Sequence, residues 1–371
     1  MIVGLPKEIK TNENRIAMTP GGVELVVSHG HQVIVEKDCG INSGFTNEMY
    51  AKAGASIEPE IDVIWKKADM IVKVKEPQAV EIARTRPGQI VFTYFHFAAD
   101  RDLTEGFLKT NAWAVAYETI ENKLGKLPLL EPMSEVAGRM ATQEGARFLE
   151  HKSGGRGVLL GGVPGVRPGI VMVLGGGIVG THATKIAAGM GAQVFILDVN
   201  LERLRELEDI MPKNVTTVYS SPANIRELLP SVDLVVGAVL LPGAKAPRLI
   251  TRDMLSLMKK GSVIVDVAVD QGGCVETCRP TTHADPTFVV DGVVHYCVAN
   301  MPGAVPYTST IALTNATLPY VVKLANNGVK AALKADAGFA LGLNMIDGKV
   351  TCAAVAEAFG LEYTPVEEVL N

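Results

Sequence analysis

Short apolar runs alternate with amphipathic stretches along most of the chain, in a pattern typical of β-α-β units. In the first 129 residues, the apolar runs predict buried strands at 2–5, 32–36, 69–74, 89–94 and 112–116. Helical patterns lie between them, at 20–28, which begins with a proline, and at 102–111. This half is therefore expected to form a parallel sheet covered by helices.

A long helical pattern precedes a second series of strands. Ser134 is a candidate N-cap for a helix over 135–151, which we expect to link two domains. Further strands are predicted at 170–174, 193–198, 215–219, 232–237, 262–266 and 293–298. The glycine-dense segment 153–165 suits a hinge, a cofactor flap or a surface linker, and the sequence does not choose among these.

The last part of the chain is mainly helical, with patterns at 308–326 and 329–337. It contains too few predicted strands for an independent α/β domain, so we expect it to pack back onto the first half. The predicted architecture is α/β, with two Rossmann-like, doubly wound domains built on parallel sheets. The discontinuous first domain comprises 1–129 and 308–371, and the second comprises 130–307.

Composition narrows the class of protein. A chain of 371 residues with 47% hydrophobic residues and 37 glycines fits two domains with large buried sheets. The net charge of −5 and pI near 5.9, without a long basic cluster, disfavour nucleic acid or an anionic membrane as a partner. No apolar run is long enough to span a bilayer, and charges come too early for a signal peptide, so a cytoplasmic location is expected.

The cysteines point to a reducing compartment rather than to a disulfide framework, since five are scattered over the chain. Cys274, Cys278, His283 and Cys297 are close in sequence, but their loose spacing favours small buried thiols over a zinc site. We therefore predict no metal.

The segment 170–180 ends in a glycine turn that is typical of dinucleotide-binding sites. Gly175 permits a tight turn, Gly177 lets the backbone approach a pyrophosphate, and Gly180 lets the next helix pack closely on the sheet. Asp198, at the end of the next strand, is placed to bind a ribose 2′-hydroxyl and to repel a 2′-phosphate. NAD is therefore favoured over NADP, although Arg203 nearby weakens the preference.

Polar residues just after the strands are the candidates for chemistry, because ligands of open α/β sheets bind at the carboxyl ends of the strands. Five residues have this placement: Arg15, Lys75, His96, Asp270 and Asn300. Four of them also have an ordinary explanation, since Arg15 and Lys75 could be solvated, His96 could be a core histidine and Asp270 could cap a turn. Their shared placement around one cleft favours a functional site.

Several longer motifs resemble those of the alanine dehydrogenase family, which includes the NAD-binding subunit of proton-pumping transhydrogenase. These are Gly4-Leu-Pro-Lys-Glu-Ile-Lys10 with Asn14-Arg15, Val72-Lys-Val-Lys-Glu-Pro77, 131–140, 266–273, 295–303 and 308–315. The resemblance runs over the whole chain and implies NAD-dependent, reversible deamination of L-alanine to pyruvate and ammonium. It also implies a homohexamer.

The resemblance assigns roles to individual residues. It makes Arg15 and Lys75 substrate-binding, and His96 and Asp270 catalytic. Besides the three glycines of the turn, it implicates as cofactor-binding Ser134, Ile178, Val179, Asp198, Arg203, Ser220, Val239, Leu240, Val267, Asp270, Arg279, Val298, Asn300 and Met301. Some family members hold a metal with an acid and a histidine late in the chain, but the region here reads Ala325-Asn-Asn-Gly328, so no such ion is expected.

These side chains suit the oxidation of an amino acid. An arginine can bind the substrate carboxylate through two hydrogen bonds, a lysine can bond the developing carbonyl oxygen, and a histidine can move protons near neutral pH. Asp270 would hold the attacking water or orient the amine, and Asn300 with Met301 would help seat the nicotinamide. Two alternatives stay open: a hydride-donor subunit of a transhydrogenase, and a saccharopine-type dehydrogenase with a larger cavity.

Overall fold

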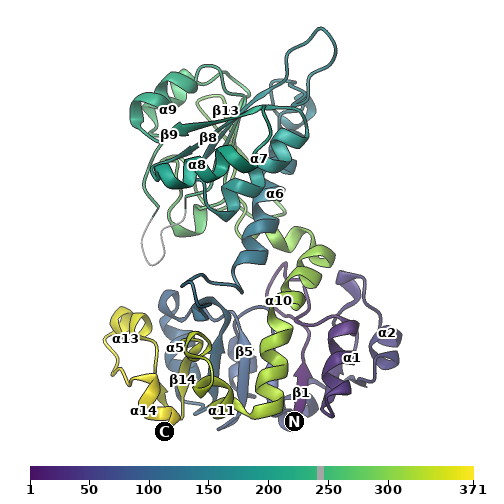
Figure 1. The fold of residues 1–371 in the computed structure, drawn as a ribbon. Coiled ribbons are helices and arrows are strands. Elements are labelled where there is room, and N and C mark those ends of the chain that lie inside the picture. The colour runs from purple at the N-terminus through teal and green to yellow at the C-terminus, as the bar shows by residue number, and fades with distance from the viewer. Residues whose placement is uncertain (240–245) are drawn as a thin grey trace. The chain divides into compact units, whose positions relative to one another are not determined.

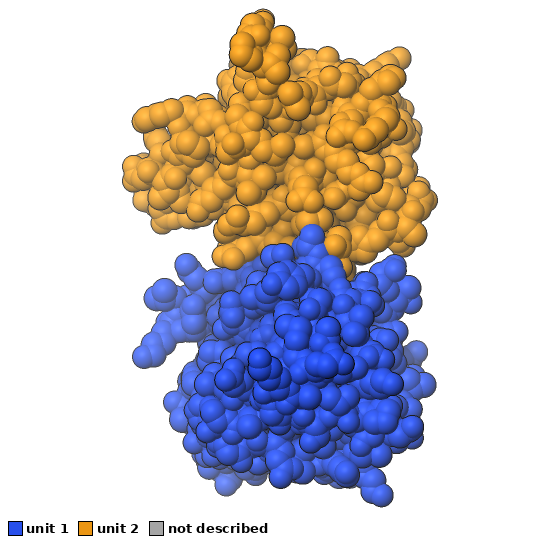
Figure 2. Space-filling view, turned by 90° about the vertical axis from the view of Figure 1, so that its right-hand side faces the viewer, with its two compact units in different colours: residues 1–133, 305–371 blue, residues 134–304 orange. Residues whose placement is uncertain are grey.

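The computed structural model describes residues 1–239 and 246–371, which divide into two compact units. Unit 1 comprises Met1–Met133 and Val305–Asn371, and unit 2 comprises Ser134–Ala304 (Figures 1 and 2). Each unit contains one mainly parallel sheet, which confirms the predicted α/β fold. None of the helices in the described part of the chain combines the length and apolar character that crossing a membrane requires.

The sheet of unit 1 has eight strands in the order β15-β14-β6-β5-β4-β1-β2-β3. Strands β1 to β6 are parallel, whereas β14 is antiparallel to β6 and β15 is antiparallel to β14. Their bounds are β1 Ile2–Leu5, β2 Gln32–Glu36, β3 Ser56–Glu58, β4 Met70–Val72, β5 Ile90–Thr93, β6 Trp113–Ala116, β14 Leu343–Ile346 and β15 Lys349–Val350.

Helices cover both faces of this sheet, because alternate strand residues enter two separate cores. One core joins Val72 and Phe92 to helices α1, α10 and α11, and the other joins Ile71 and Val91 to α3, α5 and α13. The helices of unit 1 are α1 Pro20–Ser28, α2 Asn47–Lys52, α3 Ile61–Lys67, α4 Ala79–Ile82, α5 Arg101–Leu108, α10 Pro306–Asn327, α11 Val329–Lys334, α12 Ala337–Ala340, α13 Ala353–Phe359 and α14 Val366–Leu370.

Unit 2 has a seven-stranded sheet in the order β12-β13-β11-β10-β7-β8-β9, in which β12 alone is antiparallel to its neighbour. The strands are β7 Ile170–Leu174, β8 Gln193–Asp198, β9 Val215–Tyr219, β10 Leu234–Gly237, β11 Val263–Asp266, β12 Thr287–Val290 and β13 Val293–Tyr296. The helices after β7, β8 and β9 are α7 Ile178–Gly189, α8 Leu201–Ile210 and α9 Pro222–Leu228.

The predicted helix over 135–151 differs from the observed one. Helix α6 spans Glu131–Phe148, so Ser134 lies inside its first turns and is not an N-cap. Pro132 explains the earlier start, because a proline fits the first turn of a helix, where its missing N–H costs no hydrogen bond. Both sheets also depart from the prediction in having antiparallel strands at an edge: β12 in unit 2, and β14 with β15 in unit 1.

Candidate active site

A cavity of unit 2 lies where the order of the strands reverses. Strands β8 and β9 lie to one side of β7 and strand β10 to the other, which is the position where open α/β sheets bind ligands. The cavity has a volume of about 530 Å³. Eight of the predicted cofactor-binding residues line it: Ser134, Gly175, Gly177, Ile178, Val179, Asp198, Ser220 and Val239.

The glycine turn shapes the wall of this cavity. Gly175 has φ of +101°, which side-chain-bearing residues rarely adopt. A Cβ added at Gly180 would lie 1.8 Å from the carbonyl oxygen of Gly175, so helix α7 packs directly on the turn that precedes it. A Cβ at Gly177 would meet nothing within 4 Å, which leaves open space beside the first residue of α7.

Asp198 and Arg203 both bind the glycine turn. The Asp198 carboxylate accepts hydrogen bonds from the backbone N–H groups of Gly176, at 2.7 Å, and Asn200, at 2.9 Å. The Arg203 guanidinium donates from Nε to the Gly176 carbonyl and from Nη2 to Thr181 Oγ1, both at 2.8 Å. Its Nη1 pairs with Glu206 at 2.7 Å. Since the guanidinium is committed to these partners, it is poorly placed to receive a 2′-phosphate.

The other predicted cofactor residues are not among the described residues that line the cavity. Arg279 is exposed, with its guanidinium 4.3 Å from the centre of the Phe288 ring. Asn300 has a left-handed backbone with φ of 60°. The remaining ones are the buried Val298 and Met301, the half-buried Val267 and the exposed Asp270. Leu240 lies outside the described residues.

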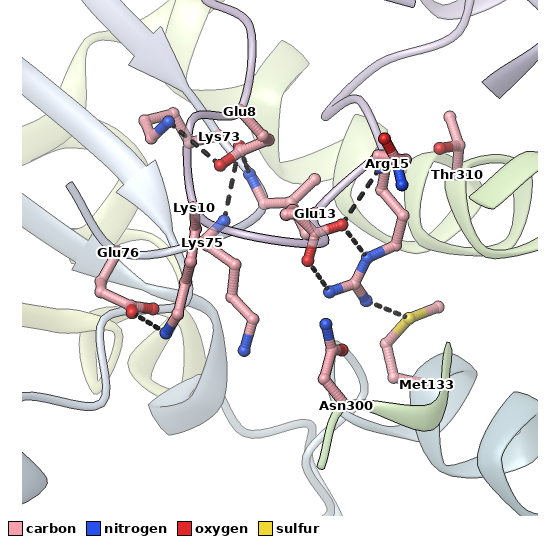
Figure 3. Close-up of polar contacts among 12 residues, drawn as sticks. Glu8, Lys10, Glu13, Arg15, Lys73, Lys75, Glu76, Met133, Asn300 and Thr310 are labelled. Atoms are coloured by element: carbon pink, nitrogen blue, oxygen red, sulfur yellow. Dashed lines mark hydrogen bonds and ion pairs between the residues drawn. The ribbon is translucent and has the colours of Figure 1, made fainter. Parts of the chain in front are cut away.

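In unit 1, Arg15 is buried together with a glutamate that sequence reasoning missed. Glu13 accepts from Arg15 Nε at 2.7 Å and from Nη2 at 2.5 Å, so one edge of the guanidinium is already bound to a carboxylate. Arg15 Nη1 donates to the sulfur of Met133 at 3.1 Å (Figure 3). Arg15 and Glu13 together carry no net charge.

Lys75 follows β4 and differs from Arg15 in having no ion pair with any residue of the described ranges 1–239 and 246–371. Its pKa is lowered from the usual value, first because burial removes water from the ammonium and then because the positive charge of Arg15 is near. A neighbouring glutamate fixes the backbone here, since Glu8 Oε1 accepts from Val74 N at 2.6 Å and from Lys75 N at 3.4 Å.

Glu8 is itself held by a buried lysine. Lys73 has no exposed surface, and its Nζ lies 3.1 Å from Glu8 Oε2 and 2.8 Å from Glu81 Oε1 (Figure 3 shows the Glu8 contact). The sequence contains a signal for this ion pair. A lysine within an apolar strand, as in Ile71-Val-Lys-Val74, is rarely buried unless it is paired with an acid.

His96 follows β5 in a left-handed backbone conformation, with φ of 54°. The Glu118 carboxylate stabilises this conformation by accepting from the N–H groups of Phe95, at 3.0 Å, and His96, at 2.5 Å. The imidazole stacks on Tyr94, with ring centres 5.9 Å apart. His96 keeps an exposed surface, yet the pKa of its imidazole is lowered from 6.5, mainly through partial desolvation by the surrounding protein; the charge of Lys75 lowers it further, while Glu118 opposes the shift.

Arg15, Lys75 and His96 thus come from the loops after β1, β4 and β5, which are adjacent strands at the carboxyl edge of one sheet. The positive charge of Arg15 acts on the pKa of Lys75, and that of Lys75 acts on the pKa of His96, so the three groups share one electrostatic environment. Asp270 belongs to unit 2, in the loop after β11.

No group of three or more His, Cys, Asp or Glu side chains that could hold a metal ion occurs within residues 1–239 and 246–371. Burial raises the pKa of the Cys274 thiol to about 12, which keeps this thiol protonated.

Comparisons with known proteins match the whole length of the chain. Residues 4–137 match the family model described as alanine dehydrogenase/PNT, N-terminal domain, and residues 141–353 match the C-terminal domain of the same family. The chain is 56% identical to the alanine dehydrogenase of Halomonas elongata, over all of both chains. It is 54% identical to that of Bacillus subtilis, over all of this chain and 98% of the relative.

Solved structures agree with these relatives. A structure titled L-alanine dehydrogenase has a TM-score of 0.95 and 52% identity, with 97% of this chain and 99% of the other covered. A transhydrogenase from Sinorhizobium meliloti has a TM-score of 0.81 and 25% identity, with 95% of this chain and all of the other covered.

Proposed function

The chain belongs to the alanine dehydrogenase/PNT family, and from this premise we propose which of its side chains carry the reaction. The chain is an NAD-dependent L-alanine dehydrogenase. It converts L-alanine, water and NAD⁺ to pyruvate, ammonium, NADH and a proton, and the reverse.

The cavity of unit 2 has features that suit NAD⁺. Open space beside Gly177, at the start of α7, would accommodate a pyrophosphate near the backbone N–H groups of the helix. Asp198 lines the cavity and could accept a hydrogen bond from a ribose hydroxyl. The bound cofactor would supply an acceptor for the hydride that leaves the α-carbon of alanine. The commitment of Arg203 to Gly176, Thr181 and Glu206 supports NAD rather than NADP.

Lys75 is the observation that carries the proposal for the substrate. It is a partly buried ammonium without an ion-pair partner in the described residues, beside Arg15 and His96. An isolated cation in such a place is costly unless an anion joins it, and the alanine or pyruvate carboxylate is an anion of suitable size. Lys75 then binds the carboxylate and the oxygen that develops at the α-carbon.

Arg15 is proposed to assist substrate binding with one side of its guanidinium rather than with two parallel hydrogen bonds. Its Nε and Nη2 are bound to Glu13, so a carboxylate would approach the side of Nη1. The bond of Nη1 to the Met133 sulfur is weak and can be exchanged for a charge-assisted bond to the substrate. Glu13 meanwhile holds the guanidinium in a fixed orientation, which positions the substrate.

His96 is proposed as the general acid and base. Since its pKa is lowered, the imidazole is neutral at neutral pH and can accept a proton as water adds to the imine carbon. The same group returns a proton to the nitrogen as ammonia leaves. Asp270 is proposed to hold the water or orient the amine.

The test is the rate of NADH formation, followed by absorbance, with alanine, with saccharopine and without an amino acid. The unaltered enzyme should act on alanine alone. Lys75→Gln should lose about 1.5–3 kcal/mol of charge-assisted binding, which is at least tenfold in kcat/KM for alanine. Lys37→Gln, which removes an exposed lysine after β2, is the matched control and should retain wild-type values.

A Lys75→Gln variant with unchanged kcat/KM would refute the role of Lys75. Formation of NADH from saccharopine but not from alanine would show that alanine is not the substrate. The transhydrogenase alternative predicts NADH binding with no turnover of alanine.

The family resemblance also supports two further proposals, that the chain forms a homohexamer and that it acts in the cytoplasm. The mass of the particle in solution, measured by light scattering, tests the first. Fractionation of cells of the source organism, followed by detection of the protein, tests the second.

A further inference from the structure

We propose that Asp266 is a positioning residue that holds Asp270 in place by tying together the two ends of the loop that carries it. This inference rests on the proposed function, because it assigns Asp266 a role through Asp270. It concerns unit 2 alone.

Asp266 is the last residue of β11 and has no exposed surface. Its Oδ1 accepts a hydrogen bond from the N–H of Ala268 at 3.0 Å. Its Oδ2 accepts from Cys274 N at 2.7 Å and from Val275 N at 3.2 Å. The three donors lie on both sides of Asp270 in the sequence, so one carboxylate joins the start of the loop to its end.

The loop between these donors is a tight turn with its own backbone bonds. Gln271 N and Gly273 N both donate to the Ala268 carbonyl, at 2.9 and 3.1 Å, and Gly272 N donates to Val269 O at 3.1 Å. Gly272 and Gly273 have φ of 94° and 75°, which reverses the chain. Asp270 is exposed on this turn, whereas Val269 before it is buried.

Two glycines pack closely against the Asp266 carboxylate. A Cβ added at Gly237 would lie 2.8 Å from Oδ1, and one at Gly273 would lie 2.8 Å from Oδ2. No side chain larger than glycine fits at either place without displacing the carboxylate. Because the site is buried, backbone N–H groups that lost this acceptor would lack a replacement for it.

Burial raises the pKa of Asp266 to about 6, although the three backbone bonds and a hydrogen bond with the Cys278 side chain oppose this shift. A hydrophobic residue would avoid the cost of burying a carboxyl group here, but it would leave the three N–H groups without an acceptor. The carboxyl group is therefore explained by the loop that it holds.

The decisive variant is Asp266→Asn, which keeps the shape of the side chain but replaces an accepting oxygen with an amide nitrogen. At least one of the three backbone N–H groups then faces the amide nitrogen, which is a donor, instead of an accepting oxygen. Asp233→Asn is the matched control in the same sheet: Asp233 is 5% exposed, accepts from Ile170 N at 3.0 Å and pairs with Lys259 at 3.4 Å, but has no bond to this loop.

Three measurements test the proposal. Amide hydrogen exchange at Cys274 and Val275 should accelerate in Asp266→Asn but not in Asp233→Asn. The kcat for alanine should fall about 10- to 100-fold in Asp266→Asn, as expected for one lost charge-assisted bond. In an Asp270→Asn background, the same substitution should lower kcat less than about threefold, because residues that act through one another are not additive.

An Asp266→Asn variant whose exchange and kcat match those of Asp233→Asn overturns the proposal, and so does an equal loss of kcat with and without Asp270. If Asp270→Asn alone keeps the wild-type kcat, the proposed catalytic role of Asp270 fails, while the exchange data still decide whether Asp266 holds the loop. If Asp266→Asn does not fold, Gly237→Ala replaces it, since the added methyl group displaces the Asp266 carboxylate without changing its charge, and the same outcomes apply.

Discussion

At the scale of single residues, acidic side chains near the candidate groups explain how these groups are held. Glu13 binds the Arg15 guanidinium, Glu8 accepts from the Lys75 backbone and Glu118 accepts from the His96 backbone. In each case, a carboxylate fixes a cation or a backbone N–H in a loop after a strand. Such bonds matter for catalysis, because displacing a catalytic side chain by about 1 Å can lower the reaction rate by a large factor.

His96→Ala removes the proposed acid and base, so turnover of alanine should fall on the order of 10²–10⁴-fold. Binding of NADH, measured by fluorescence, should be retained. His151→Ala, which removes an exposed histidine, is the control and should leave both values unchanged. Wild-type turnover in His96→Ala would remove this residue from the mechanism.

The pH dependence of kcat/KM for alanine should respond to the charges around His96. The positive charge of Lys10 lowers the pKa of His96 and the negative charge of Glu76 raises it, and the two residues form an ion pair. The proposed role of His96 requires the neutral imidazole, so activity should fall as the pH drops through this pKa. Lys10→Met should raise the pKa and move the acid limb to higher pH, whereas Glu76→Gln should move the limb to lower pH.

The assignment of the acid limb to His96 would be contradicted if the limb moved in the same direction in both variants, or if it moved in neither. Lys37→Met is the control, since Lys37 is not among the charges that act on this imidazole.

At the scale of elements, the hydrophobic pattern predicted helices and parallel strands more accurately than antiparallel edges. The helix predicted at 20–28 is α1, because Thr19 caps it and Pro20 occupies its first turn. The antiparallel strands β12, β14 and β15 were missed, as was the parallel strand β3, because these strands are short and carry little periodicity. The turn sequences could have revealed the antiparallel strands. Both hairpins turn at an Asp-Gly pair with positive φ, Asp291-Gly292 and Asp347-Gly348.

The candidate site was predictable only in part. Residues that follow strands can be recognised in the sequence, since strand ends are marked by the apolar pattern. The partners of these residues cannot, because contacts such as Lys73 with Glu8 join positions 65 residues apart and depend on the order of strands in the sheet. Ser134 shows the same limit, since its position within α6 follows from the earlier start of the helix.

Helix α7 offers a matched test of the glycine turn. Gly180→Ala places a methyl group against the Gly175 carbonyl, so the helix must move away from the turn and NADH binding should weaken at least tenfold. Gly189→Ala, in the last turn of the same helix, meets nothing within 4 Å and should preserve binding. Equal NADH affinities of the two variants would contradict the close packing of α7.

At the scale of the whole molecule, unit 1 depends on two distant parts of the chain. Residues Leu313, Phe339 and Leu343 of the C-terminal part belong to the same core as Val3 and Phe92 of the N-terminal part. Unit 2 is continuous and has its own sheet and its own core. The two units should therefore differ in how they tolerate being cut out of the chain.

A fragment of residues 134–304 should fold by itself, with cooperative thermal unfolding by circular dichroism and measurable NADH binding. A fragment of residues 1–133 should not fold until a fragment of residues 305–371 is added, because part of its core is missing. Cooperative unfolding of residues 1–133 alone would contradict this dependence.

The pairing of β6 with β14 has a consequence for synthesis on the ribosome. Translation delivers β6 early and β14 more than two hundred residues later, after all of unit 2. During that interval, the apolar segment that becomes β6 lacks its partner strand β14, and such a segment can pair with strands from neighbouring chains. We therefore expect this segment to need protection from other polypeptides, by chaperones that bind the growing chain, until residues 343–346 have been made.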